Sequence, residues 1–274
     1  ISKAQEIFEN DIVVDSYIDN KGLIANIRSY AVFDYLKAKL QGGDDDEGYA
    51  ISSDVLSATQ FGAPQKRMRF VVMGIRKDIT DEVKLPEGKY KDGPYWTVED
   101  AIKDLEDVEP VYNVSDDKSG VKLQAKSNLS ELAQTLRDSE ILHNHIITKT
   151  TPTAMERFKA LDQGQNFHSL SDEMKTNTYT DVTKTQNTIY LRLKYDEPSG
   201  TVVNVRKSMW VHPTKDRAVS IREAARLQTF PDSFIFCGTK DKQYQQVGNA
   251  VPPIMAKAIA KKLASQLNKA LSQK

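Results

Sequence analysis

The sequence predicts an α/β fold, and three features support this prediction. A segment with apolar residues at helical spacing, 24–40, precedes two segments with strand character, 49–56 and 69–75. The second strand segment contains Phe-Val-Val-Met-Gly-Ile, a nearly continuous apolar run that is typical of a strand covered on both faces. The chain has 274 residues, enough for one large or two modest domains. We therefore expect helices packed against a sheet, together with a second region.

The middle of the chain is expected to be irregular. Gly42-Gly43 should end the first helix, and Asp44–Glu47 predicts an exposed acidic loop. After Arg76 the composition becomes polar, because residues 79–200 are rich in Asp, Lys, Thr and Asn. The elements expected there are brief helices at 96–105 and 153–161 and a strand at 188–193. Loops carried on a scaffold are commonly sites of recognition.

Two helices are expected near the end of the chain. Ser220 is placed as an N-cap with Glu223 at the capping-box position, which predicts a helix over 220–227. Residues 252–271 show an amphipathic pattern, and prolines suit the first turn of a helix.

Composition excludes several classes of protein. Hydrophobic residues make up 39% of the chain and charged residues 28%, as in a globular protein. No apolar run approaches the roughly 20 residues that span a bilayer, and no signal-peptide pattern opens the chain. The single Cys237 excludes a disulfide framework and a multi-cysteine metal site, which suits a reducing cytosol, and it is expected to be a buried or half-buried apolar residue. The chain begins with Ile, so we expect the natural start to lie upstream.

The charge distribution is more informative than the net charge of zero. The segment 205–226 is basic, which predicts either a nucleic-acid surface or, equally, a solvated charged face. A second basic group lies in the segment Ala63–Phe70, where Gln65, Arg67 and Arg69 alternate by two and would face one way on a strand. Guanidinium groups suit a phosphate or a base edge, although an arginine pair bridging to acidic loops is the alternative.

Three segments, in this order, resemble motifs of the DNA cytosine-5 methyltransferases. Gly62-Ala63-Pro64 followed by Gln-x-Arg-x-Arg is similar to the eighth of the family's ten motifs. Arg222–Asp232 is similar to the ninth, and Gln246–Pro252 to the tenth. The similarity runs from about residue 49 onward and includes shorter matches at 96–102, 143–145, 198–202 and 212–213.

The resemblance implies roles for individual residues. Arg67 and Arg69 would contact the flipped cytosine and a backbone phosphate, with Gln65 as a hydrogen-bonding support. S-adenosylmethionine would lie beside Gly248, Asn249 and Ala250. Asn249 is alternatively a cap of the last helix, and the two roles are compatible because a helix N-terminus favours a carboxylate.

The region between the motifs would recognise DNA in the major groove. Thr201 resembles part of a dipeptide that touches the backbone near the target, and Arg206 and Lys207 add positive charge. Arg222 and Arg226 lie four apart on one helical face, where phosphate contact and internal ion pairs are both open. The histidines of His143-Asn-His145 lack companions at metal-ligand spacing, so no metal site is expected.

The implied fold is the tail of a Rossmann-like methyltransferase domain plus a smaller loop-rich target-recognition domain. Residues 1–78 would belong to the catalytic domain, 79–240 to the recognition domain, and 241–274 would return to the catalytic domain. The family's cofactor loop, Pro-Cys nucleophile and Glu-Asn-Val motif are not found in this sequence. We therefore expect a chain that is inactive alone.

The implied partners are double-stranded DNA and an N-terminal part or subunit that carries the cofactor loop and the catalytic cysteine. The setting would be the cytoplasm of a bacterium, or a phage-encoded protein, in restriction–modification. Two alternatives remain: a non-catalytic DNA-binding module from a degenerate methyltransferase, and an interaction domain whose motifs persist only for folding.

Overall fold

The computed structural model describes residues 13–19, 22–27, 32–42, 48–176 and 185–273. The chain divides into two compact units. Unit 1 consists of 1–55, 70–86 and 259–274, and unit 2 consists of 56–69 and 87–258. The content is mixed α/β, as the sequence predicts. The domain boundaries expected from the sequence stay a prediction.

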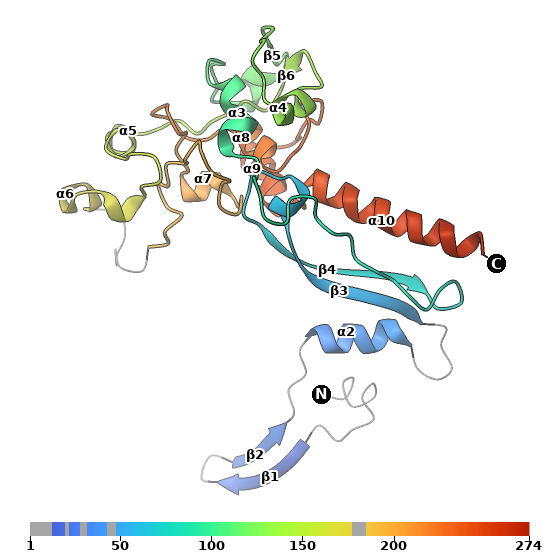
Figure 1. The fold of residues 1–274 in the computed structure, drawn as a ribbon. Coiled ribbons are helices and arrows are strands. Elements are labelled where there is room, and N and C mark those ends of the chain that lie inside the picture. The colour runs from blue at the N-terminus through green and yellow to red at the C-terminus, as the bar shows by residue number, and fades with distance from the viewer. Residues whose placement is uncertain (1–12, 20–21, 28–31, 43–47, 177–184, 274) are drawn as a thin grey trace. The chain divides into compact units, whose positions relative to one another are not determined.

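Unit 1 contains two pairs of strands, one helix between them in the sequence and the C-terminal part of the last helix (Figure 1). β1 (Val13–Asp19) pairs antiparallel with β2 (Gly22–Ile27), and α2 (Val32–Gln41) follows. The single helix predicted over 24–40 is therefore wrong at its start, because residues 24–27 pair with β1. The apolar residues at 24 and 27 fit a helical spacing, but the backbone of this segment pairs with β1 and is therefore a strand. The predicted acidic loop 44–47 lies outside the described residues.

The strands predicted at 49–56 and 69–75 are confirmed as β3 (Tyr49–Ser57) and β4 (Met68–Arg76), which pair with each other. One face of this ribbon forms the core of unit 1. Ala50, Met73 and Ile75 are buried there with Val83, and apolar residues at 259, 263 and 267 of α10 (Pro253–Leu271) pack against them.

The other face of the ribbon differs from the prediction of a strand covered on both sides. Phe70 and Val72 are 51% and 38% exposed on β4. A continuous apolar run predicts a strand that is buried on both faces. The residues that the structure describes bury side chains on one face of β4 and leave the other face largely exposed.

Unit 2 is built from short elements joined by long loops. Its core surrounds Trp210 and the buried apolar residues of α3, α4 and α8. A second apolar cluster contains Phe158, Phe167 and Tyr190. The α-helices are α3 (Val98–Ile102), α4 (Glu131–Leu136), α5 (Pro152–Lys159), α6 (Asp172–Lys175), α7 (Val205–Ser208), α8 (Ile221–Leu227) and α9 (Lys240–Asn249). The 3-10 helices and strands are η1 (Ala58–Phe61), η2 (Lys103–Leu105), η3 (Val114–Asp117), β5 (Val121–Lys122), β6 (Ile141–Leu142) and η4 (Phe167–Ser169).

The helices predicted at 96–105, 153–161, 220–227 and 252–271 are present with slightly different ends. The strand predicted at 188–193 is wrong: the segment forms a turn, and Arg192 makes one isolated bridge with Val211. Cys237 is exposed, not buried, because its side chain lies in the loop before α9. Across the described residues, no helix is long and apolar enough to cross a membrane.

Candidate functional site

Gly62 forms the turn that precedes the Gln-x-Arg-x-Arg segment. It ends η1 in the left-handed conformation with φ of 95°, and its N–H is bonded to the carbonyls of that short helix. A Cβ at Gly62 would lie 3.2 Å from Ile254 Cδ1 and 3.3 Å from Tyr90, so the position is also crowded. The strand β4 begins at Met68. Of Gln65, Arg67 and Arg69, only Arg69 therefore lies in this strand, and the expectation that all three alternate along one strand is wrong.

Gln65 is fully buried, and both ends of its amide are bonded. Nε2 donates to Leu227 O at 3.1 Å and to Gln228 Oε1 at 2.6 Å. Oε1 accepts from the Val202 N–H at 3.1 Å. Gln228 in turn donates from Nε2 to Val247 O at 2.7 Å. One glutamine therefore joins the loop before β4 to a loop at 202 and to the end of α8.

Arg67 continues this network. Nη1 donates to Val202 O at 2.6 Å, and Nη2 donates to Gly248 O at 3.0 Å and to Ala250 O at 2.9 Å. Burial and the nearby charge of Arg69 lower the pKa of Arg67 to about 10. We call the side chains of Gln65, Arg67 and Gln228, with the backbone groups they bind, the polar clamp.

Arg69 differs from its neighbours in being partly exposed. Its Nη1 donates to Met68 O at 2.7 Å, and it forms no ion pair with any residue that the structure describes. The guanidinium group therefore keeps donors available for a ligand, unlike that of Arg67.

The clamp fixes the turn at 248–250. A Cβ at Gly248 would lie 2.7 Å from Val203 C, so no side chain fits there. Asn249 is the last residue of α9, and α10 begins at Pro253, so the suggestion that Asn249 caps the last helix is wrong. The Asn249 side chain is exposed instead. The sequence offered no signal for α9, whose apolar positions are few.

The residues between 201 and 226 that were predicted to contact DNA form an exposed group and a buried group. Thr201 is partly exposed and donates from Oγ1 to Lys66 O at 2.9 Å, next to the clamp. Arg206 and Lys207 are exposed on α7, where Arg206 Nη1 pairs with Asp241 at 2.8 Å. All three side chains have surface that a ligand could reach.

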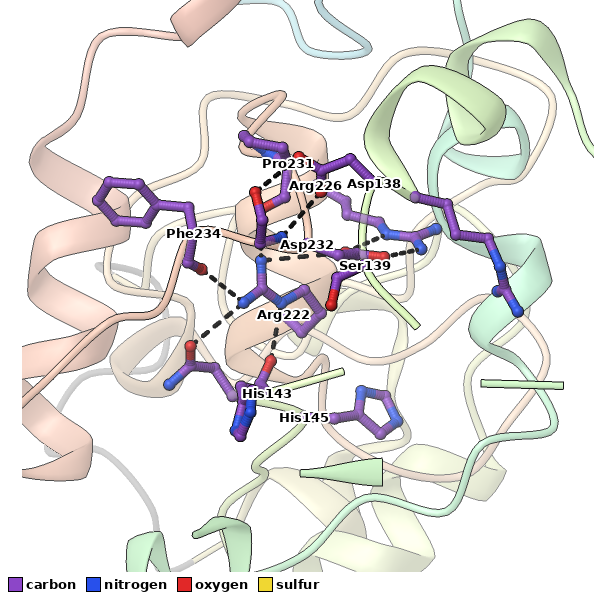
Figure 2. A network of polar contacts seen from close by, with 12 residues as sticks. Asp138, Ser139, His143, His145, Arg222, Arg226, Pro231, Asp232 and Phe234 are labelled. Atoms are coloured by element: carbon purple, nitrogen blue, oxygen red, sulfur yellow. Dashed lines mark hydrogen bonds and ion pairs between the residues drawn. The ribbon is translucent and has the colours of Figure 1, made fainter. Parts of the chain in front are cut away.

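Arg222 is buried completely in α8, and Figure 2 shows its internal partners. Its Nε donates to His143 O at 2.8 Å, Nη1 to Pro231 O at 3.0 Å, and Nη2 to Phe234 O at 2.7 Å. Burial lowers its pKa to about 10, although Asp232 lies 3.9 Å away. A guanidinium group with no exposed surface and this many partners is structural.

Arg226 is buried one turn further along α8. It forms a bidentate pair with Asp232, at 2.9 Å from Nε and 2.5 Å from Nη2, and a further ion pair with Asp104. Arg137 bonds the second oxygen of Asp104 at 2.8 Å. Internal ion pairs, one of the two alternatives open from the sequence, are thus what the structure contains for Arg222 and Arg226.

Glu223 completes the polar contacts of α8. Its carboxylate accepts from the Ser220 N–H at 2.8 Å, in the predicted capping box, and from Arg217 at 2.6 and 2.9 Å. Burial alone would raise the pKa of Glu223, but Arg217 holds it well below its usual range. Burial lowers the pKa of the neighbouring His212 to about 4, so this imidazole is neutral.

The histidines around residue 144 have structural contacts as well. His145 Nε2 is 2.9 Å from Val108 O, and Nδ1 is 3.0 Å from Ser220 Oγ. Asn144 bonds the backbone of Phe236 through both ends of its amide. In the described part of the chain, no cluster of His, Cys, Asp and Glu could hold a metal ion.

Comparison with known proteins accounts for these motifs. Residues 26–265 match the family of C-5 cytosine-specific DNA methylases. Type II methyltransferase M.DdeI of Desulfomicrobium norvegicum is 28% identical over 246 residues, which cover 84% of this chain and 58% of the relative. M.AquIB of Picosynechococcus is 35% identical over 144 residues, covering 48% of this chain and 95% of that relative.

A solved structure gives the same result. It is described as a DNA modification methyltransferase encoded within a prophage (E. coli), with 26% identity and a TM-score of 0.62. The match covers 80% of this chain and 61% of the other. The chain thus spans a little under two thirds of that protein and of M.DdeI. On the match over 26–265, the chain belongs to the C-5 cytosine-specific DNA methylase family.

Proposed function

We propose that this chain is the C-terminal portion of a DNA cytosine-5 methyltransferase and supplies DNA recognition, base-flipping contacts and closure of the cofactor pocket. The polar clamp is the observation that carries this proposal. It joins the segment bearing Arg69, the loop bearing Thr201 and the turn at 248–250 through buried hydrogen bonds. A rigid connection of this kind would hold a DNA contact and a cofactor contact at a constant separation.

Of the three polar residues in the eighth motif, one would contact the target DNA and two would position the segment that carries it. Arg69 has free donors, so we assign it to the flipped cytosine or the adjacent phosphate, where a guanidinium group would replace lost base pairing. The Nη groups of Arg67 and the Nε2 group of Gln65 are bonded to buried protein groups, so we assign both residues to positioning. This modifies the expectation that both arginines contact the target.

The proposed DNA surface contains Thr201, Arg206 and Lys207. Each is at least partly exposed, and two carry positive charge that phosphate attracts. Arg222 and Arg226 are left out of this surface, because their donors are bonded internally and neither side chain is exposed.

The cofactor contact would come from the turn at 248–250. Asn249 presents an exposed amide and Val251 an exposed apolar side chain, a combination that suits one polar and one apolar part of S-adenosylmethionine. The cofactor would supply the methyl group. The remaining walls, the cofactor loop and the cysteine that attacks C6 would belong to an N-terminal portion or a separate subunit. That M.AquIB is matched over 95% of its length supports the existence of such short chains.

The test combines this chain with the polypeptide encoded immediately before residue 1, or in the adjacent reading frame. Tritiated methyl incorporation into duplex DNA is expected from the mixture and from neither part alone. Methylation by this chain alone would contradict the proposal. DNA binding without methylation by any mixture, and no cofactor loop or Pro-Cys in either frame, would favour the non-catalytic DNA-binding module.

A further inference from the structure

Thr229 follows α8 in a backbone conformation that a β-branched residue rarely adopts. Its φ is 67°, in the left-handed region, and the other non-glycine residues with positive φ in the described part of the chain are not β-branched. The Thr229 N–H donates to Arg226 O at 2.8 Å, and the Phe230 N–H donates to Ala225 O at 2.9 Å. This pair of bonds commonly ends an α-helix, and glycine is the usual residue at the left-handed position. A threonine there is strained, so other contacts must hold it in place.

The hydroxyl group of Thr229 has a partner on α10. The side chain is 4% exposed, and Oγ1 accepts from the Ile254 N–H at 3.2 Å. Ile254 is the second residue of α10, so its N–H has no partner within the helix. A helix often satisfies this donor with the side chain of the residue before its first turn. Here that residue is Pro252, whose carbonyl accepts from the Ala256 N–H at 2.9 Å and whose side chain has no acceptor. Thr229 therefore caps α10 from a distant segment.

This cap holds the second end of the turn that follows α9. At the first end, the polar clamp binds the carbonyl groups of residues 248 and 250. At the second end, Thr229 binds the first turn of α10. The exposed side chains of Asn249 and Val251 lie between these two points in the chain. A turn that is held at both ends presents its side chains in a constant geometry, which reduces the cost of ordering them around a ligand.

We propose that Thr229 is a positioning residue for the cofactor contact and acts through its hydroxyl group on the turn at 248–252. This inference rests on the proposed function, which assigns the cofactor contact to that turn. It also gives a reason for the strained conformation. Glycine would relieve the backbone at this position but would offer no acceptor to the Ile254 N–H. Strained residues of this kind are common at ligand-binding sites, where the surrounding contacts determine them.

The first test uses this chain alone and measures amide hydrogen exchange by mass spectrometry. Thr229→Val keeps the β-branched shape but removes the hydroxyl, whereas Thr229→Ser keeps the hydroxyl. In peptides that span 250–256, Thr229→Val should exchange about fivefold faster than the unmodified chain, because the Ile254 N–H loses its acceptor. Thr229→Ser should stay within about twofold of the unmodified chain.

A matched control removes a hydroxyl elsewhere. Thr135 is exposed on α4, and its Oγ1 donates to Glu131 O at 3.0 Å. Thr135→Val should leave exchange in 250–256 within about twofold of the unmodified chain, because the two sites share no partner. Peptides from α5 should exchange equally in all variants, which distinguishes a local loosening from global unfolding.

The second test adds the polypeptide encoded immediately before residue 1 and measures methyl transfer to duplex DNA. Thr229→Val should raise the KM for S-adenosylmethionine about tenfold and change kcat less than about threefold, because a displaced turn weakens cofactor binding in the ground state and the transition state alike. Thr229→Ser should restore the KM. A residue that served stability alone would instead lower the amount of folded enzyme, and hence the apparent kcat, with the KM unchanged.

The outcomes separate this inference from the proposed function. Unchanged exchange in Thr229→Val overturns the cap, and an unchanged KM overturns the positioning role; the proposed function stands in both cases if the unmodified mixture methylates DNA. Equally fast exchange in Thr229→Val and Thr229→Ser assigns the effect to packing rather than to the hydroxyl and also overturns the inference. A mixture that does not methylate DNA overturns the proposed function and the positioning role together, and the exchange comparison then decides the cap alone.

Discussion

Arg67 and Arg69 are two residues apart in one motif, yet the fold gives them different environments. Arg67 is buried and bonded to three carbonyl oxygens, whereas Arg69 is partly exposed and bonded to one. An arginine whose Nη donors are bonded to buried carbonyl groups stabilises a conformation, and one with exposed, unbonded donors can bind a ligand. Substitutions at the two positions should therefore have different effects.

Arg67→Ala should lower the free energy of unfolding by about 3 kcal/mol, because it leaves the carbonyl groups of Val202, Gly248 and Ala250 without donors. Denaturant unfolding measures the change. Lys66→Ala is the control: among the described residues, the Lys66 side chain forms an exposed ion pair with Glu197 and no other, and its backbone bonds do not depend on the side chain, so a change under about 0.5 kcal/mol is expected. Equal losses for both variants would contradict the clamp.

Arg69→Ala should leave stability within about 0.5 kcal/mol, since the side chain is partly exposed. Once the missing portion is supplied, the same variant should reduce methyl transfer on the order of a hundredfold, through loss of a donor directed at the target. Single-turnover methyl incorporation measures this. A variant with full activity would assign the target contact to another residue.

The lowered pKa of His212 predicts that the free energy of unfolding decreases in acid. Its pKa is about 4 in the folded chain and 6.5 when exposed, so the unfolded state binds a proton that the folded state does not between these values. Stability should therefore fall by about 3 kcal/mol as the pH drops from about 6.5 to about 4. His212→Gln should reduce the slope of unfolding free energy against pH by about one proton in this interval. An unchanged slope would assign the effect to other groups, such as His145.

At the scale of elements, α8 is the clearest example of agreement between local sequence and tertiary contacts. The capping box predicted from Ser220 and Glu223 is present. All seven residues of the helix are buried, including Arg222, Glu223 and Arg226, and each of these charged side chains has bonded partners. A seven-residue helix is too short to be stable alone, so its cap and its partners determine its position.

Ser220→Ala should destabilise the protein by about 1 to 2 kcal/mol, because the Ser220 hydroxyl accepts from the Glu223 N–H at 3.0 Å. Thr239 holds the same position before α9 but makes no side-chain cap bond, so Thr239→Ala should cost less than about 0.5 kcal/mol. Thermal unfolding of both variants makes the comparison, and equal shifts in Tm would show that capping is not the cause.

At the scale of the whole molecule, the net charge is zero, but the basic residues differ in their environments. Of those in 205–226, Arg222 and Arg226 are buried in ion pairs, and Arg217 is bonded to Glu223. Arg206 and Lys207 remain on the surface. The basic segment is thus partly a nucleic-acid surface candidate and partly an internal scaffold.

Binding of duplex DNA should therefore be weak and dependent on salt. If Arg69, Arg206 and Lys207 each neutralise one phosphate, the slope of log K against log salt should be about −3. Removing Arg206 and Lys207 together should bring the slope to about −1, and fluorescence anisotropy across a salt series measures both values. A flat series for the unmodified chain would rule out the proposed surface.

Local sequence determined the family, the two strands β3 and β4, the capping box of α8 and the course of the last helix, because each depends on residues close together in the chain. Tertiary structure decided the use of each charged group. The partners of Arg67 lie 135 to 183 positions away, and no local pattern encodes such contacts. The same reason explains the exposed Cys237 and the exposed Phe70 and Val72 of β4, since burial of a side chain depends on which distant segments pack against it.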